Sequence, residues 1–359
     1  MTNRHPIKPA LGALALAVLT ACAPAAPTPA TPAPGATAAS TSGAVTIRVG
    51  YFPNLTHSQA LIGLSRGDFQ SALGDDVKIE ATSFNAGPAV IEALFAGAID
   101  LSYIGPNPAI NGYVKSDGKA LRIVAGATSG GAAFIVRPEA GITKPEDLAG
   151  KKIATPQLGG TQDVALRNYI VTHGLQTTEN GGTVEVIPTE NSQTLDLFRQ
   201  GSIDGAWVPE PWASRLIVEG GGTVFVDERD LWPNGDFVTT HIIVSTEFLN
   251  AHPDIVKKWL EAHVSITQWE QDHPADAKAI VNTEIEKITG KKLKDDVLDQ
   301  AWERLRVTWD PIASSLKTSA ESAFNAGFLT EKPDLTGIYD LTLLNEVLAE
   351  KDLAAVSDR

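Results

Sequence analysis

The segment GAIDLSYI at residues 97–104 decides the fold, because it returns as GSIDGAWV at residues 201–208. A second pair precedes it: PNLTHSQ at 53–59 corresponds to PQLGGTQ at 156–162. The spacing is 104 residues for the first pair and 103 for the second. Two matches at nearly one spacing predict two lobes of similar structure.

Around these segments, apolar strand-like runs alternate with helix-like runs. The predicted elements of the first lobe are strands at 45–52, 77–83, 99–104 and 121–127, and helices at 59–73 and 89–96. A second series of the same kind begins at residue 151. Such alternation is typical of βαβ units, so the predicted fold class is α/β with parallel strands.

The two lobes need not follow one another along the chain. A strand-like run at 134–136 comes just before the second lobe, and another at 237–244 comes after it. If both runs pass between the lobes, the second lobe is an insertion into the first. We therefore predict a hinge of two antiparallel crossing strands, with lobe I at 45–137 and 237–359 and lobe II at 138–236. Beyond residue 245 the pattern is largely helical and is expected to wrap lobe I.

Composition excludes several classes of function. The 359 residues carry 29 Lys and Arg against 43 Asp and Glu, a net charge of −14, and so acidic a chain is a poor partner for nucleic acid. A single cysteine excludes a disulfide framework and a thiolate metal site. The seven histidines are scattered without an H-E-x-x-H motif, so we predict no metal site and no cofactor.

The N-terminus indicates export. Arg4 and Lys8 precede an apolar run at 10–19 that is too short to span a bilayer, as in a secretory signal. Residues 19–22 read Leu-Thr-Ala-Cys and resemble a bacterial lipobox, in which the cysteine is diacylated and becomes the new N-terminus. We therefore predict lipidation of Cys22, and the alternative is an ordinary signal peptide with an incidental cysteine.

These assignments divide the N-terminal part of the chain into two segments. The signal peptide is predicted at 1–21. Residues 23–44 are exclusively Ala, Pro, Thr, Ser and Gly, a composition that cannot bury a core. We expect an extended tether at 22–44.

Four strand-to-helix loops contain the residue types of an anion site. In open α/β sheets, ligands bind beyond the carboxyl ends of the strands, where helix N-termini offer unpaired backbone N–H groups. Two of these loops lie in the first lobe, and for both the alternative is a helix start without a ligand. Their candidate ligand contacts are Asn54, Thr56, His57 and Ser58 in loop one (53–58), and Gly105, Pro106 and Asn107 in loop two (105–108). In loop two, Asn107 is the expected helix cap and Pro108 the first helical residue.

The other two loops lie in the second lobe. Loop three (158–162) has two glycines before a predicted helix, but it lacks the Lys-Ser/Thr pair of a P-loop. In loop four (207–212), two tryptophans flank a glutamate, and the indoles are expected to wall an apolar ligand tail. The candidates in these loops are Gly159, Gly160, Thr161 and Gln162, and then Trp207, Glu210 and Trp212. The alternatives are a tight turn for loop three and two core tryptophans for loop four, with Glu210 binding a ligand cation or an arginine such as Arg215.

Thr240 and His241, on the predicted strand 237–244, complete the candidate contacts, with His241 as either a structural histidine or a ligand contact. None of the four loops contains lysine or arginine. An anion bound here would be held by neutral dipoles and hydroxyls. Such a site suits a singly charged, weakly hydrated head group better than a doubly charged phosphate.

Four motifs, in this order behind a lipobox, carry a resemblance to a known family: VGYFPNLTH at 49–57, GAID at 97–100, DLAGKKIA at 147–154 and WVPEPW at 207–212. With them, the chain resembles the substrate-binding lipoproteins of ABC importers in the aliphatic sulfonate, taurine and nitrate family, from about residue 45 to residue 350. The resemblance implies a type II periplasmic-binding-protein fold, with two α/β lobes joined by a two-strand hinge. It also assigns anion contacts to Ser58 and Thr161.

The partners follow from the same resemblance. They are a small anionic solute, an ABC permease with its ATPase, and the membrane through the N-terminal lipid. The chain is expected to be a monomer that faces the periplasm or the outer surface of the cell. An aliphatic sulfonate or a similar anion is the leading ligand; taurine, nitrate and a thiamine-precursor pyrimidine are alternatives, and Asp163 and Glu210 are the acids that would suit a zwitterion.

An enzyme is the competing class of function. GLSRG at 63–67 matches the G-x-S-x-G pattern of a nucleophile elbow, but the apolar spacing around Ser65 is that of a helix instead of a strand-turn-helix. Lyases and synthases on the two-lobed fold are the second enzyme alternative. We expect a binding protein without catalysis.

Overall fold

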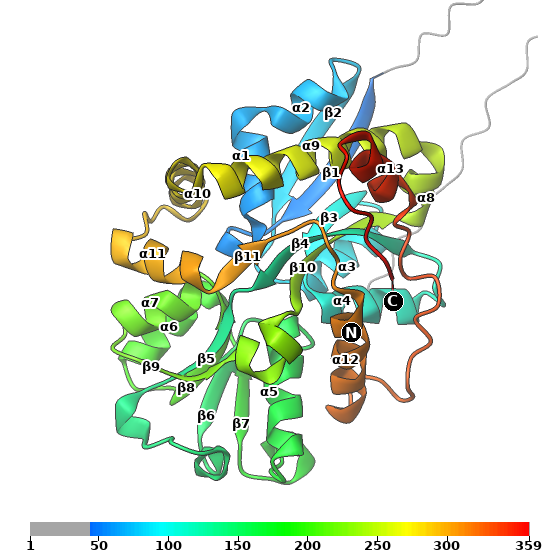
Figure 1. Cartoon of the computed structure of the whole chain (residues 1–359). Helices are drawn as coiled ribbons and strands as arrows, with labels where there is room; N and C mark the ends of the chain where they lie inside the picture. The colour runs from blue at the N-terminus through cyan, green and yellow to red at the C-terminus, as the bar shows by residue number, and fades with distance from the viewer. Residues whose placement is uncertain (1–43, 359) are drawn as a thin grey trace, which may run out of the picture. The chain divides into compact units, whose positions relative to one another are not determined.

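One strand arrangement, used twice, organises the structure. The computed structural model of the chain describes residues 44–358 and contains two mixed sheets, of six and five strands (Figure 1). The predictions for the signal segment, for Cys22 and for nearly all of the tether fall outside the described residues. In Figure 1 the green middle of the chain forms one lobe, and the blue-to-cyan and yellow-to-red parts form the other.

Lobe I contains the six-stranded sheet, in the order β11-β4-β10-β3-β1-β2. Its strands are β1 (Val45–Tyr51), β2 (Val77–Ser83), β3 (Leu101–Ile104), β4 (Leu121–Gly130), β10 (Val238–Ser245) and β11 (Leu305–Val307). Its helices are α1 (Ser58–Arg66), α2 (Asp68–Leu73), α3 (Gly87–Phe95), α4 (Pro106–Lys115), α8 (Thr246–Ala251), α9 (Pro253–Asp272), α10 (Pro274–Thr289), α11 (Asp295–Glu303), α12 (Ala313–Asn325) and α13 (Thr342–Glu350).

Lobe II contains the five-stranded sheet, in the order β7-β6-β8-β5-β9. Its strands are β5 (Ala132–Val136), β6 (Lys152–Thr155), β7 (Glu185–Pro188), β8 (Gly205–Pro209) and β9 (Thr223–Asp227), and its helices are α5 (Thr161–Thr172), α6 (Asn191–Arg199) and α7 (Trp212–Val218). In each sheet three strands are parallel, β2-β1-β3 in lobe I and β7-β6-β8 in lobe II, and an antiparallel strand follows the third.

The repeated Gly-x-Ile-Asp motif makes the same contacts in both lobes. Asp100 Oδ2 accepts a hydrogen bond from the backbone N–H of Arg48 at 2.8 Å, and Asp204 Oδ2 accepts one from Lys152 at 2.9 Å. Each aspartate donates its own backbone N–H to the carbonyl of that same residue, at 2.8 Å. The aspartate thus fixes the start of the third parallel strand against the first, which explains why this motif recurs.

The chain crosses between the lobes at places that differ from the predicted ones. Residues 134–136 belong to β5, which lies wholly in the sheet of lobe II, and β10 lies wholly in the sheet of lobe I. The first crossing is at Gly130–Gly131, earlier than the predicted boundary at residue 137, and both glycines have positive φ (72° and 78°). The second crossing is at 228–237. The antiparallel strand of each sheet is therefore the one by which the chain enters that lobe.

The predicted helix at 59–73 is two helices. Gly67 adopts a left-handed conformation (φ 75°) that ends α1 and begins α2, because a residue without Cβ takes this conformation without strain. Ser65 lies inside α1 and donates a hydrogen bond to Glu284, so GLSRG is not a nucleophile elbow. The C-terminal helices also do more than wrap lobe I: α12 contacts both α4 and α5, and α11 contacts α7 of lobe II.

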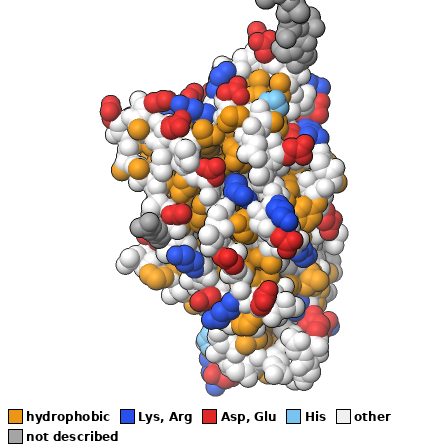
Figure 2. All heavy atoms as spheres, turned by 90° about the vertical axis from the view of Figure 1, so that its right-hand side faces the viewer, with side chains coloured by type: hydrophobic (Ala, Val, Ile, Leu, Met, Phe, Trp, Pro, Cys, Tyr) orange, Lys and Arg blue, Asp and Glu red, His pale blue; other side chains and the backbone are white. Residues whose placement is uncertain are grey.

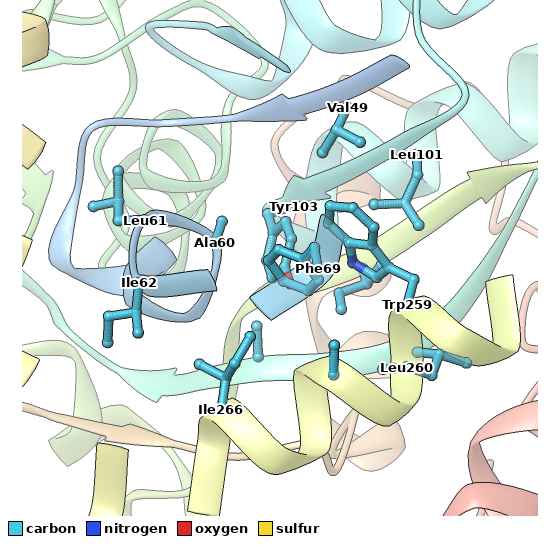
Figure 3. Close-up of a cluster of buried hydrophobic side chains, with 14 of the residues drawn as sticks. Val49, Ala60, Leu61, Ile62, Phe69, Leu101, Tyr103, Trp259, Leu260 and Ile266 are labelled. Carbon is cyan, nitrogen blue, oxygen red and sulfur yellow. The ribbon is translucent and has the colours of Figure 1, made fainter. Parts of the chain in front are cut away.

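The largest core lies in lobe I, where α1, α2 and α9 cover the sheet (Figure 3). Phe69 of α2 stacks on Trp259 of α9, with ring centroids 3.7 Å apart. Beside them lies the buried Tyr103 of β3, whose hydroxyl is 3.2 Å from His263 Nδ1. His263 Nε2 lies 3.0 Å from the carbonyl of Gly126, so a neutral imidazole satisfies both contacts.

The outer surface shows mixed charge. On the face in Figure 2, acidic and basic side chains are interspersed, without a continuous basic patch among residues 44–358. No helix within the described part of the chain has the length and apolar character needed to cross a bilayer.

We predict that His263 makes the fold sensitive to acid. Burial lowers the pKa of His263 to about 4, against about 6.5 in the unfolded chain, so between these values only the unfolded state takes up the proton. His263 therefore costs about 1.4 kcal/mol of unfolding free energy for each pH unit of acidification in that window. Urea unfolding at pH 7, 6 and 5 measures the free energy of unfolding at each pH. This free energy should fall less steeply with acidification for His263→Gln than for the wild type. Equal slopes for the wild type and His263→Gln would contradict the prediction.

Candidate functional site

The carboxyl ends of six parallel strands meet at one cavity of about 30 Å³ between the lobes. Each strand supplies a lining residue at its end or just beyond it. In lobe I these are Phe52 after β1, Asn85 after β2 and Gly105 after β3, and in lobe II they are Pro156 after β6, Asn191 after β7 and Pro209 at the end of β8. Each half of the repeat thus contributes the ends of three strands to the cavity, and lobe I supplies the larger share of the lining.

Helix N-termini surround the same cavity. Gly87 begins α3, Gly105 is the N-cap of α4, Gly160 is the N-cap of α5 and Asn191 begins α6. A fifth N-terminus is that of α1, which follows the lining residues Thr56 and His57. The first-turn N–H groups of a helix have no intrahelical partner, and the helix dipole places partial positive charge there. The arrangement favours a negative charge in the cavity.

No lysine, arginine, aspartate or glutamate is among the residues of 44–358 that line the cavity. His57 is also neutral, because burial lowers its pKa to about 3. Its Nδ1 accepts a hydrogen bond from the backbone N–H of Phe52 at 3.3 Å, so the neutral ring carries its proton on Nε2. The cavity is therefore polar, donor-rich and without formal charge.

Two buried side chains of the lining lack a partner for a polar atom within the described residues. They are Thr240, through its hydroxyl, and Asn191, through its amide oxygen Oδ1. Both residues are at least 97% buried. An unpaired buried polar group costs about 1–3 kcal/mol. The Thr240 hydroxyl can donate to an anion in the cavity, whereas the Asn191 oxygen is an acceptor and cannot.

Half of the residues proposed from sequence line this cavity. They are Asn54, Thr56, His57, Gly105, Gly160, Thr161, Gln162 and Thr240. The opposed loops nearly touch, since a methyl group added to Gly105 of lobe I would overlap the Thr161 hydroxyl of lobe II. Sequence reasoning missed Asn85, Gly87 and Asn191. The signal that could have found them was topological, because they follow the second strand of each lobe as loops one and three follow the first.

Several loop residues lie behind the cavity wall. Ser58 is the first residue of α1 and fully buried, and His57 takes the N-cap position before it without a side-chain cap. Gly159 donates its N–H to Asp163. The helix after β3 begins at Pro106 instead of Pro108, and the Asn107 amide donates to the carbonyl of Ser319 at 3.0 Å instead of capping the helix. Both prolines fit the first turn, where their missing N–H groups are not needed.

Loop four serves the structure of the lobes more than the cavity. Trp207 is fully buried in the core of lobe II against Phe134, and its indole N–H donates to Glu228 at 2.8 Å. Glu210 is also fully buried, and its carboxylate accepts hydrogen bonds from Ser214 and Arg304. The partner of Glu210 is thus Arg304, from the end of α11, and not Arg215, which pairs with Glu219.

Trp212 connects the lobes. Its indole N–H donates to Asn54 Oδ1 of lobe I at 3.1 Å, and close by the backbone N–H of Leu55 donates to the carbonyl of Glu210 at 3.1 Å. His241 does not line the cavity; its Nε2 lies 3.1 Å from the carbonyl of Pro311, and burial lowers its pKa to about 4. In the structure it is a neutral, buried histidine of the lobe I sheet.

A second, larger pocket of about 370 Å³ adjoins the cavity, and the two share Asn54, Asn85 and Asn191 as lining residues. Its apolar lining consists of Phe84, Leu195, Trp212 and Ile288, with Pro53. Its charged lining consists of Arg215 and Lys291 with Asp196. We call it the outer pocket. Trp212 lines the outer pocket, whereas Trp207 lines neither the outer pocket nor the cavity.

Comparisons with known proteins bear on the fold and the family of the chain. A putative aliphatic sulfonates-binding protein of Bacillus subtilis (strain 168) is 26% identical over 309 residues, which is 85% of this chain and 88% of the relative. The alkanesulfonate-binding protein SsuA from Xanthomonas axonopodis pv. citri, bound to MOPS, superposes with a TM-score of 0.68 at 17% identity, covering 82% of this chain and 98% of SsuA. The periplasmic nitrate-binding protein NrtA from Synechocystis PCC 6803 has a TM-score of 0.71 at 16% identity, covering 85% of this chain and 89% of NrtA.

These structures confirm the predicted fold, two α/β lobes of the periplasmic-binding-protein kind, and the relatives confirm the resemblance to substrate-binding proteins of ABC importers. The sequence model of the NMT1-like family matches residues 40–285 of this chain. Since that match covers more than half of the sequence, the chain belongs to the NMT1-like family.

Proposed function

We propose that this protein is the lipid-anchored solute-binding component of an ABC importer and that it binds a small, singly charged organic anion, an aliphatic sulfonate or a close analogue. The lobes close on the solute, and the closed form delivers it to a permease that an ATPase drives. The family and the named relatives support the transport role. The cavity supports the class of ligand.

One observation carries the choice of ligand: five helix N-termini converge on a cavity whose described lining has no charged side chain. A sulfonate has three acceptor oxygens and one delocalised charge, so backbone N–H groups, hydroxyls and amides can satisfy it. A doubly charged phosphate needs more compensation, which arginine and lysine usually supply. The site therefore suits the weakly hydrated monoanion.

The outer pocket supports an organic tail on that anion. The cavity has room for only a compact head group, and the outer pocket continues from it past Asn54 and Asn191 with an apolar wall that includes Trp212. Nitrate would leave this compartment to water. The ammonium of taurine would meet Arg215 and Lys291 there as well as Asp196. Asp163 and Glu210, the acids suggested from sequence, are already paired with Arg167 and Arg304.

A thermal-shift screen tests the proposal with C1–C6 alkanesulfonates, taurine, nitrate, sulfate, phosphate and thiamine-precursor pyrimidines. A solute present at 100 times its Kd adds about 2.7 kcal/mol to the free energy of unfolding. We expect stabilisation by alkanesulfonates and none by phosphate, with the sulfonate recovered unchanged after incubation. Stabilisation by phosphate without stabilisation by sulfonate would refute the proposed class of ligand. Turnover of the sulfonate would refute the binding function and favour the enzyme alternative.

Replacing Thr240 by valine should separate binding from stability. Its hydroxyl is buried without a partner, so the isosteric Thr240→Val change should leave the melting temperature of the ligand-free protein equal or higher. The same change should weaken sulfonate binding about tenfold, the effect of one lost hydrogen bond to a charged group. Calorimetry and thermal melts measure both.

Thr267→Val is the matched control for this pair of measurements. The Thr267 hydroxyl is equally buried but donates to the carbonyl of His263 at 2.8 Å. Its loss should lower stability by about 1 kcal/mol and leave the affinity unchanged. If Thr240→Val behaves like this control, Thr240 does not contact the ligand.

Gly105→Ala should block closure of the lobes. The added methyl group would overlap the Thr161 hydroxyl only when the lobes are together, so the open form should accept it. We expect sulfonate affinity to fall at least about tenfold while the ligand-free melting temperature stays within about 3 °C, because the cost falls on the closed state. X-ray scattering should show no compaction on adding sulfonate, whereas Lys115→Ala, at the far end of α4, should compact normally.

The proposed anchor depends on Cys22. In cells, Cys22→Ser should release the protein from the membrane fraction, because stable anchoring requires the attached acyl chains. Detergent partitioning of the wild type and the variant measures this, and mass spectrometry of the wild type should show a diacylated N-terminal cysteine. An unmodified Cys22, or membrane association that survives the change, would contradict the lipid anchor.

A further inference from the structure

Glu270 is a buried carboxyl group that the proposed site does not use directly. It lies near the end of α9 and is 1% exposed, and neither of its oxygens has a hydrogen-bond partner of normal geometry among the described residues. Its polar neighbour is the hydroxyl of Ser58, the first residue of α1. The Ser58 hydroxyl donates only a long hydrogen bond, of 3.4 Å, to Gln59 Oε1.

The position of Glu270 matters because α1 is one of the five helices whose N-termini surround the cavity. Ser58 directly follows His57, which lines it. A carboxylate and a bound anion cannot both occupy the same helix N-terminus without repelling one another. A neutral carboxyl group causes no such conflict.

We propose that Glu270 is a positioning residue for the anion cavity: in its protonated form it leaves the N-terminus of α1 to the solute, and in its ionised form it competes with the solute for that N-terminus. The proposal rests on the proposed function and adds proton-coupled regulation to it. Uptake of the solute then holds the proton on Glu270, and loss of the proton weakens uptake, because the coupling is reciprocal.

The surroundings of Glu270 favour the protonated form. Burial raises its pKa to about 8, and the Ser58 hydroxyl opposes this effect. The nearby titratable side chains of β3 and α9 are Tyr103 and His263; burial raises the pKa of Tyr103 and lowers that of His263 to about 4, so both are neutral at pH 7. His57, 6.3 Å from Tyr103 between ring centroids, is neutral as well.

Several charged groups on the elements packed against α9 form ion pairs, and Arg66 also stacks on Trp269 of α9. Arg66 of α1 pairs with Asp68 of α2, and Arg306 of β11 pairs with Asp236. The pairs on α10 and toward α13 are Lys278–Asp299, Lys287–Glu284, Lys257–Glu346 and Lys257–Glu350. None of these groups contributes to the pKa of Glu270, so its ionisation depends on burial, on Ser58 and on the bound solute.

Calorimetric titration between pH 6 and pH 9.5 tests the inference, with methanesulfonate, ethanesulfonate and nitrate as probes. The affinity of the wild type should fall about tenfold from pH 7 to pH 9.5, because ionisation adds one negative charge beside the N-terminus of α1. The affinity of Glu270→Gln should stay within about twofold across this pH range. The exposed Asp272→Asn, two residues away, should retain the pH dependence of the wild type.

Two further measurements exclude a purely structural role. At pH 8, titrations in buffers of different ionisation enthalpy should show net proton uptake on binding for the wild type and none for Glu270→Gln. Ser58→Ala removes the hydroxyl that lowers the pKa of Glu270, so its affinity should fall only at a higher pH than in the wild type. This variant also serves if Glu270→Gln fails to fold.

The outcomes separate the two proposals. No binding of any probe at pH 6 would overturn the proposed function, and this inference with it. Binding that is independent of pH in the wild type, or equally pH-dependent in Glu270→Gln, would overturn the role of Glu270 while leaving the solute-binding function intact.

Discussion

The convergence of five helix N-termini on one cavity is the constraint around which both lobes are arranged. It requires several helices to begin at one place, and parallel strands that end at a common edge provide this. The geometry of both sheets brings the helices together, and the neutral state of His57 leaves the cavity without a formal charge from its described lining. A site of this kind selects by charge density and shape, because its donors are fixed in the backbone.

The parts of the fold that follow from local rules could be predicted from sequence. Asp100 and Asp204 each hold the start of a strand through hydrogen bonds to the backbone of the neighbouring strand. This local role explains why the motif that contains them can be recognised twice in the sequence. Glycine-rich loop three exposes backbone amides by its composition. The crossing at Gly130–Gly131 was placed too late because β5 is apolar on both faces and a sequence does not tell which sheet such a strand joins.

The residues that were missed or misassigned depend on long-range packing. Trp207 and Trp212 are alike in sequence, yet one packs into a core beside Glu228 and the other reaches across to Asn54. Arg304 lies 94 residues from Glu210 along the chain, and no local pattern joins them. Asn191 follows its strand without the glycines that mark loop three, so the three-dimensional equivalence of the two lobes is what identifies it. Glu270 occupies an ordinary position on a long amphipathic helix.

The division of the cavity between two equivalent halves has a consequence for turnover. Both lobes supply lining residues, so a bound guest would lose part of its contacts as soon as the lobes separate. Under the proposed function, one rigid separation of the lobes would therefore release the solute. A permease that separated the lobes would empty the protein without contacting the solute itself.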